Sequence, residues 1–434
     1  MKKILIFADI DIGNNEVTRI YWSVDIKTLA FAKYLYQKKG WDIYLLTKQY
    51  KNYILNIEIN SLYNIKIIKK CRFKDAVFDL LFVPYSYIFD GFFVESVKRF
   101  RIMVKFLILS IPAIHWLEDS DNANIKILRI YSYFIRKNVD LIITTNKRMQ
   151  MYLQEFWYLF IKFPKNRVKR IELGFDDAGL IDRYIARKKY IKCKEDDIVI
   201  INTGGIWGWT DFNSFLIAFI KAVRDGKKNL KLYIMGKKQK NNFEKTNIRY
   251  IQEFENIIKD NKDLLNKNIF ISDWSSPDKI NKFISGADVG LNVNKDTLEN
   301  IFSSRVRLTD YIKAGIPVIY TFGDEMSNFF REKNIGWQVK PGDIMGYYDI
   351  LKNLTHDDIN RMKLKIRLIR NDFKWDNIIE KFWKEEKNIF NKPLRANAPN
   401  LSINGLYVRY SFSKLLRKIS VFTKLIKLIT KGIK

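Results

Sequence analysis

The sequence predicts an α/β protein built from two Rossmann-like domains that face each other, with a basic amphipathic helix at the C-terminal end. Its 434 residues are too many for one compact core and fit two domains of ordinary size. Short apolar runs alternate with amphipathic ones over most of the chain, as in parallel sheets covered by helices. The alternation starts afresh after the charged stretch ARKKYIKCKEDD. We expect domains at 1–185 and 186–371, a helix over 372–391 that packs back on the body, and a linker and tail over 392–434.

In the first domain, the expected strands are largely apolar runs of six or seven residues. Between the first two of them, Leu29, Ala32 and Tyr36 recur at helical spacing and Gly40 follows as a C-cap, which predicts a helix. The runs are KKILIFA (2–8), DIYLLTK (42–48), NIKIIKK (64–70), the segment 77–83, IPAIHW (111–116), DLIITT (140–145) and VKRIEL (168–173).

The second domain repeats the alternation, which is the pattern of a nucleotide-binding sheet. Its expected strands are DIVIINTGG (197–205), LKLYIMG (230–236), NIFIS (268–272), ADVGLNV (287–293) and IPVIYT (316–321).

The formal charge of +30 favours contact with phosphates, although a bias toward lysine codons would raise it as well. Cys71 and Cys193 lie far apart without metal-type spacing, which favours a reducing compartment. The N-terminal segment has the pattern of a strand, and no apolar run reaches the ~20 residues of a membrane-spanning helix. We expect no metal and no cofactor.

The tail predicts a basic amphipathic helix. Apolar residues recur in steps of four and three from Leu415 to Ile433, seven lysines and arginines accompany them over 414–434, and no acidic residue follows Glu386. Such a helix docks on an anionic membrane with its apolar stripe in the acyl boundary, so we expect membrane contact through 413–434. The alternative is a coiled-coil contact with a protein, since the spacing also fits heptads.

Three strand-to-helix loops of the second domain are candidates for a ligand site, because ligands bind beyond the carboxyl ends of the strands. In TGGIWGWTDF, Gly204 and Gly205 let backbone amides approach a ligand. In NVNKDTLENIFSSR, a helix is expected to start at Ser303 or Ser304 and to offer amides to an anion. In FGDEMSN, Gly323 precedes another helix start.

The helix after the second loop carries further candidates. Helical spacing places Arg307, Asp310 and Ala314 on one face and Arg305 on another. A carboxylate such as that of Asp310 accepts hydrogen bonds from both hydroxyls of a ribose. The alternative is a surface ion pair between Arg307 and Asp310.

The order TGGIWGWTD, LKLYIMG, IFISDW, ADVGLNV, ENIFSSRVRLTDYIKAGIPVI and GDE resembles the nucleotide-sugar half of bacterial GT-B glycosyltransferases of family four, over about residues 197–345. The resemblance implies a GT-B fold and a retaining, metal-independent sugar transfer. It implies that Asp310 binds the ribose and that Glu299 is the acid near the donor sugar. In that family, a pair of basic residues after the first strand of this domain commonly binds the diphosphate, and this pair is missing here. We therefore expect Arg305, Arg307 or the backbone amides of Ser303 and Ser304 to bind the diphosphate.

The acceptor is expected to enter from the first domain. Gly13 and Asn14 follow the first strand and can approach the donor. His115 and Glu118, in HWLED after an expected strand, suit hydrogen bonding or proton transfer, with His115 as a catalytic candidate.

These observations favour a hexosyltransferase-type glycosyltransferase that moves a sugar to a lipid-linked or polysaccharide acceptor in bacterial cell-surface glycan synthesis, such as lipopolysaccharide or capsule. We expect it to be cytoplasmic and peripheral on the inner face of the cell membrane. One alternative is a nucleotide-sugar epimerase of the same fold, which needs no acceptor. The other is a basic nucleic-acid-binding protein, which the sequence supports only by its charge, since no specific recognition motif is present.

Overall fold

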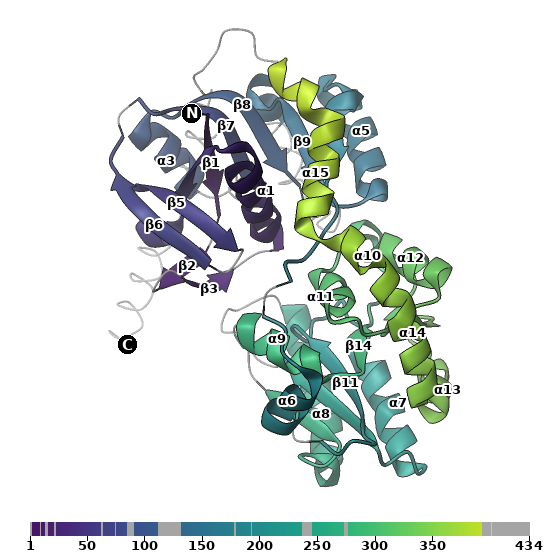
Figure 1. Cartoon of the computed structure of the whole chain (residues 1–434). Coiled ribbons are helices and arrows are strands. Elements are labelled where there is room, and N and C mark those ends of the chain that lie inside the picture. The colour runs from purple at the N-terminus through teal and green to yellow at the C-terminus, as the bar shows by residue number, and fades with distance from the viewer. Residues whose placement is uncertain are drawn as a thin grey trace, which may run out of the picture.

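The computed structural model describes residues 2–8, 10–13, 16–20, 23–61, 64–73, 75–84, 91–111, 132–177, 179–191, 193–236, 245–272, 277–392 and 401. Two sheets, each flanked by helices, form two halves of the molecule that lie one above the other in Figure 1. The expected α/β class is therefore confirmed. We call these parts the first half and the second half.

The first half contains a sheet in the order β10-β9-β8-β7-β1-β4-β5-β6-β3-β2. The strands from β10 to β4 are parallel, and the rest of the sheet is antiparallel. The strands are β1 (Lys3–Phe7), β2 (Ile10–Gly13), β3 (Glu16–Ile20), β4 (Asp42–Leu46), β5 (Ile54–Ser61), β6 (Asn64–Cys71), β7 (Val77–Pro84), β8 (Met103–Ser110), β9 (Leu141–Thr144) and β10 (Val168–Arg170).

This sheet corrects two expectations. A wholly parallel sheet was wrong, because β5 and β6 form an antiparallel hairpin whose second strand alternates buried and exposed residues at its start, as a strand covered on one side does. No strand was expected directly before 111–116, whereas β8 spans Met103–Ser110; of the strand expected at 111–116 the structure describes only Ile111, so that expectation stays a prediction. The apolar run of β8 contains Lys105, which is exposed and pairs with Asp79 at 2.7 Å, so its charge does not interrupt the strand.

Helices cover both faces of the first sheet. On one face, α3 (Gly91–Phe100) and α5 (Lys147–Ile161) supply buried aromatic residues such as Phe93 and Trp157. On the other face, α1 (Ser23–Lys39) packs with α15 (Trp375–Glu386), which brings Trp375 into the core. The last long helix of the described chain thus belongs to the half in which the chain began.

The second half is a parallel sheet in the order β13-β12-β11-β14-β15-β16, in which the five expected strands are confirmed. Chain order reverses between β11 and β14, and this reversal marks the topological switch point where α/β proteins bind ligands. The strands are β11 (Ile198–Thr203), β12 (Leu230–Met235), β13 (Ile269–Ser272), β14 (Val289–Asn292), β15 (Val318–Thr321) and β16 (Gly336–Val339).

Two groups of helices sandwich this sheet. One core cluster joins α7 (Phe212–Arg224), α8 (Lys245–Asp260) and α13 (Ile344–Asn353) to one face. The other cluster joins α9 (Pro277–Gly286), α11 (Val306–Ala314) and α12 (Glu325–Lys333) to the opposite face. The helices α6 (Arg183–Ala186), α10 (Leu298–Phe302) and α14 (His356–Ile369) complete this half.

Two chain segments cross between the halves side by side. Phe175 donates its N–H to the carbonyl of Phe373 at 2.9 Å, and Trp375 donates to the carbonyl of Phe175 at 3.1 Å. Lys33 of α1 pairs with Asp176 at 3.0 Å and with Asp376 at 3.3 Å, one acid on each crossing. The crossings are therefore fastened to each other and to the first half.

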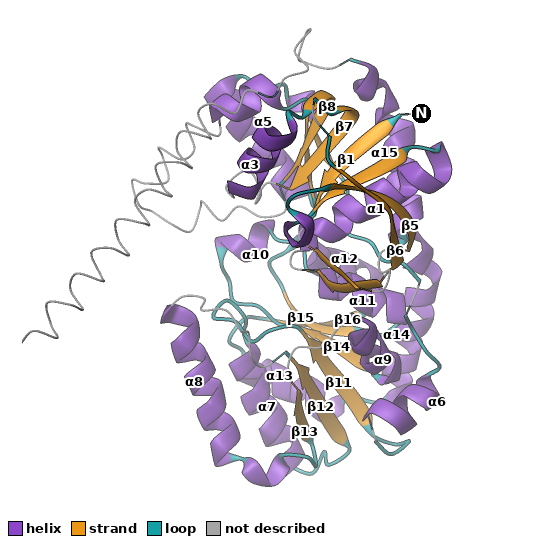
Figure 2. Ribbon diagram, turned by 90° about the vertical axis from the view of Figure 1, so that its left-hand side faces the viewer, coloured by secondary structure: helices purple, strands orange, loops and turns teal. Residues whose placement is uncertain are grey.

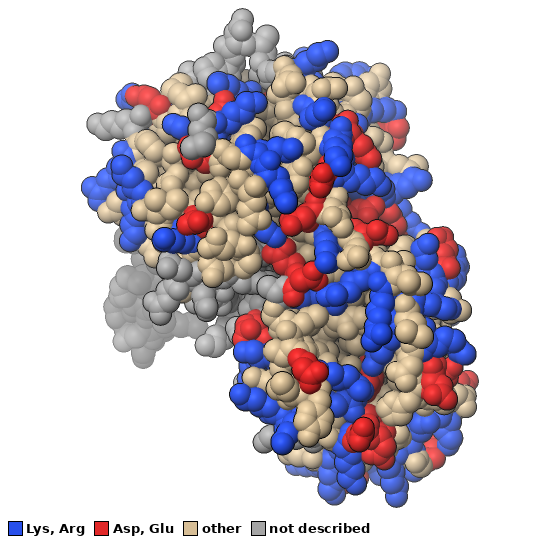
Figure 3. All heavy atoms as spheres, in the orientation of Figure 1, with Lys and Arg blue, Asp and Glu red and all other residues tan. Residues whose placement is uncertain are grey.

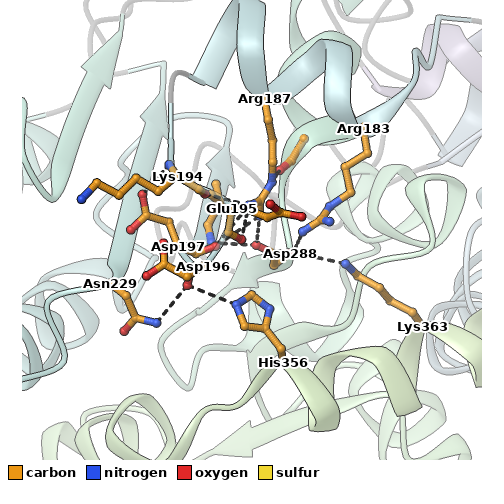
Figure 4. Close-up of polar contacts among 12 residues, drawn as sticks. Arg183, Arg187, Lys194, Glu195, Asp196, Asp197, Asn229, Asp288, His356 and Lys363 are labelled. Atoms are coloured by element: carbon orange, nitrogen blue, oxygen red, sulfur yellow. Dashed lines mark hydrogen bonds and ion pairs between the residues drawn. The ribbon is translucent and has the colours of Figure 1, made fainter.

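A buried ion cluster fixes the segment after the first crossing to the amino end of β14 (Figure 4). Asp288 is completely buried, and it pairs with Arg183 at 2.5 Å, with Lys363 at 3.2 Å and closely with Arg187. Burial by itself would raise the pKa of Asp288, but the three cations outweigh it and hold that pKa below its ordinary value. Because all three cations contact the one buried carboxylate, this cluster holds the structure together here.

Among the described residues, no helix is long and apolar enough to cross a membrane. Figure 3 shows Lys and Arg side chains distributed over both halves of one face, with acidic residues between them. The predicted amphipathic helix over 413–434 lies outside the described residues.

Candidate functional site

The candidate site lies at the carboxyl ends of β11 and β14. Gly204 follows β11 with a φ of 124°, a conformation that favours glycine. A β-carbon at Gly204 would be 3.0 Å from Nη2 of Arg307, so the guanidinium packs directly against the glycine backbone. The structure thus brings together two residues that the sequence predicted for a diphosphate site.

Arg307 is a cation without an acidic partner among the described residues. Its Nη1 donates to Oδ1 of Asn202 at 3.2 Å. The Nδ2 of Asn202 in turn donates to the carbonyl of Gly204 at 3.2 Å, which fixes the orientation of the Asn202 side chain. Burial lowers the pKa of Arg307 below its ordinary value, since no carboxylate offsets the desolvation. A desolvated guanidinium beside glycine backbone suits a phosphate group.

Asp310 lies one turn further along α11. Its carboxylate makes no hydrogen bond or ion pair with another described residue, and it does not pair with Arg307. Burial raises its pKa to about 6, although the positive charge of Lys313 acts in the opposite direction. The alternative of a surface ion pair between Arg307 and Asp310 is therefore wrong.

Arg305 differs from Arg307. It is the N-cap residue of α11, and its Nη2 donates to Oδ1 of Asn300 at 2.5 Å. Burial raises the pKa of Asp324, and the positive charge of Arg305 is one of the influences that oppose this rise. Arg305 thus serves contacts within the protein, and Arg307 is the better candidate for the diphosphate.

The predicted serine cap is wrong. Ser303 is the C-cap of α10, where its hydroxyl donates to the carbonyl of Asn300 at 3.2 Å, and α11 begins only at Val306. The short helix α10 begins after Thr297, whose hydroxyl accepts from the N–H of Asn300. This earlier cap moves both Ser303 and Ser304 into the connection between two helices, so neither heads a helix that offers free amides.

The third predicted loop is occupied by protein contacts. Gly323 adopts a φ of 131°, and its carbonyl accepts a hydrogen bond from the side chain of Arg148 in the first half. Asp324 caps α12 by accepting from the N–H of Ser327 at 2.6 Å. Asp324 therefore engages the N–H of Ser327 at this helix start, and a role of Gly323 in donor binding stays a prediction.

The structure describes the remaining predicted site residues only in part. Glu299 lies in α10, but its side chain is outside the described part. Gly205 follows Gly204 and packs against the ring of Trp207. Gly13 ends β2 at the edge of the first sheet. Asn14, His115 and Glu118 lie outside the described residues, so their proposed roles stay predictions.

The sequence missed a contact that joins the first half to these loops. Asn146 caps α5, and its Nδ2 donates to the carbonyl of Phe302 at 2.8 Å and to the hydroxyl of Ser304 at 3.1 Å. An asparagine directly after the strand DLIITT is a helix-start signal, which predicts the cap. The signal does not reveal that the same side chain reaches the second half.

Glu325 makes the second contact of this kind. Its Oε2 accepts from the backbone N–H groups of Lys147 at 2.5 Å and Arg148 at 3.3 Å, and Arg170 pairs with its Oε1 at 3.0 Å. A carboxylate of the second half thus completes the cap of α5 in the first half, where the helix dipole favours negative charge. We call the contacts of Asn146 and Glu325 the α5 latch.

No group of three His, Cys, Asp or Glu side chains in the described part of the chain is placed to hold a metal ion. Among the described residues beyond the carboxyl ends of β11 and β14, Arg307 and Asp310 each lack a partner of opposite charge at hydrogen-bond distance. The arrangement can hold a diphosphate at Arg307 and a pair of hydroxyls at Asp310.

No protein-family model and no curated protein matches the sequence. Among solved structures, sucrose-phosphate synthase from Thermosynechococcus elongatus is 12% identical with a TM-score of 0.59, and the alignment covers 90% of this chain and 100% of that one. HepE from Anabaena, in complex with UDP and glucose, is 11% identical with a TM-score of 0.60 over 89% of this chain and 100% of that one. A glycosyltransferase from Rickettsia africae is 14% identical with a TM-score of 0.56 over 90% and 99%. These similarities confirm the predicted GT-B fold, whereas membership of family four stays a prediction.

Proposed function

We propose that this protein is a glycosyltransferase that transfers a hexosyl group from a nucleotide-sugar donor to a lipid-linked or polysaccharide acceptor. The observation that carries the proposal is the unpaired charge at the switch point. Arg307 and Asp310 are half-buried on one helix, each without a partner of opposite charge at hydrogen-bond distance among the described residues. Desolvated charges at a strand-to-helix junction of this kind are candidates for a ligand site.

Each part of a nucleotide-sugar has a matching group. Arg307, held by Asn202, faces the diphosphate, and the backbone at Gly204 allows the phosphates to come close. Asp310 accepts hydrogen bonds from the ribose hydroxyls. As the glycosidic bond breaks, negative charge accumulates on the leaving diphosphate, and a cation already in place stabilises it without reorganisation. We propose that the transfer is retaining and that Glu299 adjoins the donor sugar.

The structural comparisons support this choice of ligand. HepE was solved with UDP and with UDP-glucose, and trehalose-6-phosphate synthase from E. coli with UDP-2-fluoro glucose. Those proteins have the same fold as this chain. The donor base and sugar of this protein are not implied by the comparison, so several donors belong in the test.

The acceptor side of the proposal rests on the tail. The basic apolar repeat over 413–434 fits an anionic membrane, which would bring the enzyme to a lipid-linked acceptor on the cytoplasmic face. Binding to vesicles with and without anionic lipid tests this part. Deletion of 401–434 should abolish sedimentation with anionic vesicles and leave transfer to a soluble acceptor intact. Vesicle binding that survives the deletion would locate the membrane contact elsewhere.

Release of nucleoside diphosphate tests the activity itself. The full-length protein would be incubated with UDP-, ADP-, GDP- and CDP-sugars in the presence of bacterial membrane extract. We expect one class of donor to release its diphosphate only when extract is present. An isomerised donor without release would identify an epimerase instead, and the absence of binding and turnover with every donor would contradict the proposal.

A further inference from the structure

We propose that Trp207 and Trp209 form an aromatic platform that stacks against the sugar ring of the donor and selects it. The inference rests on the proposed function, because it assigns the sugar subsite of the same site. Both tryptophans lie on the loop that follows β11 and leads to α7, directly after Gly204 and Gly205.

The two indoles are stacked on each other. Their ring centroids are 4.7 Å apart and their planes differ by 10°, and both residues remain partly exposed. A stacked pair in a core is covered on all sides, whereas this pair lies on a loop at the carboxyl edge of the sheet. It therefore offers aromatic surface at the edge where ligands of this fold bind.

Hydrogen bonds fix the loop that carries the pair. The hydroxyl of Thr210 donates to the carbonyl of Trp207 at 2.7 Å. Lys295, which follows β14, donates its backbone N–H to the carbonyl of Trp209 at 2.9 Å and its Nζ to the carbonyl of Gly208 at 2.7 Å. The loops on both sides of the switch point are thus joined, so the rings are held in place before a ligand arrives.

The platform adjoins the proposed diphosphate site. A β-carbon at Gly205 would be 2.6 Å from Nε1 of Trp207, so this ring lies against Gly205 as the guanidinium of Arg307 lies against Gly204. Consecutive glycines therefore separate the cation from the aromatic pair. We therefore assign the group that follows the diphosphate along the ligand to Trp207.

The order of groups along the donor decides which part meets the indoles. The helix α11, which carries Asp310, packs on one face of the second sheet, and α7 packs on the opposite face (Figure 2). If the ribose lies at Asp310 and the diphosphate at Arg307, the sugar lies beyond Arg307, whose guanidinium packs against Gly204 at the start of the loop that leads to α7. This order assigns the sugar, rather than the nucleobase, to the tryptophans.

The chemistry of the platform fits this ligand. One face of a hexose ring exposes mainly C–H groups, and the electron-rich face of an indole attracts their partial positive charge. Such a contact discriminates sugars by the orientation of their hydroxyls, because an axial hydroxyl directed at the ring would be buried without a partner.

Binding measurements on paired ligands test the proposal. The variants Trp207→Ala and Trp209→Ala would be titrated calorimetrically with the nucleotide-sugar that the native protein binds and with the matching nucleoside diphosphate. We expect affinity for the nucleotide-sugar to fall by about tenfold and affinity for the diphosphate to change by less than about twofold. Trp209→Phe should retain most of the affinity, since it keeps an aromatic face.

A control variant and the pattern of affinity changes distinguish this proposal from its alternatives. Trp41→Ala removes a partly buried tryptophan from the first half, where it packs edge-on against Trp383, and should change neither affinity. Equal losses for both ligands would assign the platform to the nucleotide, and unchanged affinities would assign it a structural role; either result overturns the proposal. Failure of the native protein to bind any nucleotide would instead contradict the proposed function.

Discussion

Arg307 and Asp310 lie one turn apart on the same face of α11 and form no ion pair. Residues three apart on a helix are neighbours, so an arginine and an aspartate at this spacing ordinarily pair. Here Arg307 is directed to Asn202 and Gly204, while the carboxylate of Asp310 has no hydrogen-bonding partner among the described residues. Two desolvated charges kept apart cost stability, and a ligand that carries both a diphosphate and a ribose would offset that cost.

Replacing Arg307 by glutamine should separate binding from stability. We expect affinity for a nucleoside diphosphate to fall by roughly 10- to 100-fold, since a charge-assisted contact contributes about 1.5 to 3 kcal/mol. The melting temperature of the ligand-free protein should not fall, because the substitution removes a half-buried cation that has no acidic partner among the described residues. Calorimetric titration and thermal unfolding would measure the two effects. Arg361→Gln, on the exposed side of α14, is the control, and a lower melting temperature with unchanged affinity would refute the role of Arg307.

Asp310 should make donor binding dependent on pH. Its pKa is raised to about 6, so the carboxylate is ionised at pH 8 and largely protonated at pH 5. The ionised form can accept from both ribose hydroxyls with charged oxygens, whereas protonation removes the charge and turns one oxygen into a donor. Affinity for the nucleoside diphosphate should therefore decrease as the pH falls through about 6, beyond the change that the phosphate itself causes.

The variant Asp310→Asn provides the comparison for that experiment. It should bind more weakly at pH 8 and lose the step near pH 6, while a donor with a 2′-deoxyribose should bind the native protein and the variant with similar affinity. The raised pKa also means that ionised Asp310 destabilises the folded state above about pH 6. Asp310→Asn should therefore unfold at a higher temperature than the native protein at pH 8, with the difference vanishing below about pH 4.

Most of the second half was predictable from the sequence because strands such as β11, β14 and β15 are buried on both faces, whereas the half-buried β16 was not predicted. The continuous apolar run DIVIINT identifies β11 as a buried strand and indicates where it begins and ends, without knowledge of the neighbouring strands. The antiparallel strands of the first half were not identified as such. Pairing direction depends on contacts between segments, and β2, at the sheet edge, has only four residues to show a pattern.

The site was predictable in the same uneven way. Helical spacing was sufficient to place Arg307 and Asp310 on one face of α11. The partner of Arg307, Asn202, lies 105 residues away in sequence, and Asn146 is 158 residues from Ser304, so no local pattern links them. The serine cap failed for a different reason, because Thr297 begins an extra helix a few residues earlier.

The α5 latch should control how the two halves sit together. Glu325 accepts two backbone hydrogen bonds and one ion pair from the first half, and ionised acceptors make such bonds stronger than neutral ones. We expect Glu325→Gln to weaken the contact by about 1 to 3 kcal/mol and to increase the radius of gyration of the ligand-free protein. Small-angle X-ray scattering would measure this change.

Glu332 offers a matched control for the latch, because it is an exposed glutamate near the other end of the same helix. Glu332→Gln should leave the scattering curve unchanged. Asn146→Ala should act in the same direction as Glu325→Gln and should also weaken donor binding, since Asn146 holds Ser304 beside the proposed site. Identical scattering from all three variants and the native protein would show that the latch does not hold the halves together.

Lys27 should make the stability of the first half depend on pH. Its side chain is completely buried, and among the described residues Nζ donates one hydrogen bond, to the carbonyl of Thr144 at 3.3 Å. Burial lowers its pKa to about 7, whereas an unfolded chain holds the proton up to about pH 10. The unfolded state thus binds one more proton between these values, and stability rises with pH across that interval by up to about 1.4 kcal/mol per pH unit. Lys27→Met should be more stable than the native protein at pH 7, and the difference should shrink toward pH 10.

Denaturant unfolding at several pH values would measure this difference in stability. Lys38→Met, on the exposed part of α1, is the control. A difference between Lys27→Met and the native protein that does not vary with pH would contradict the burial of a neutral amine.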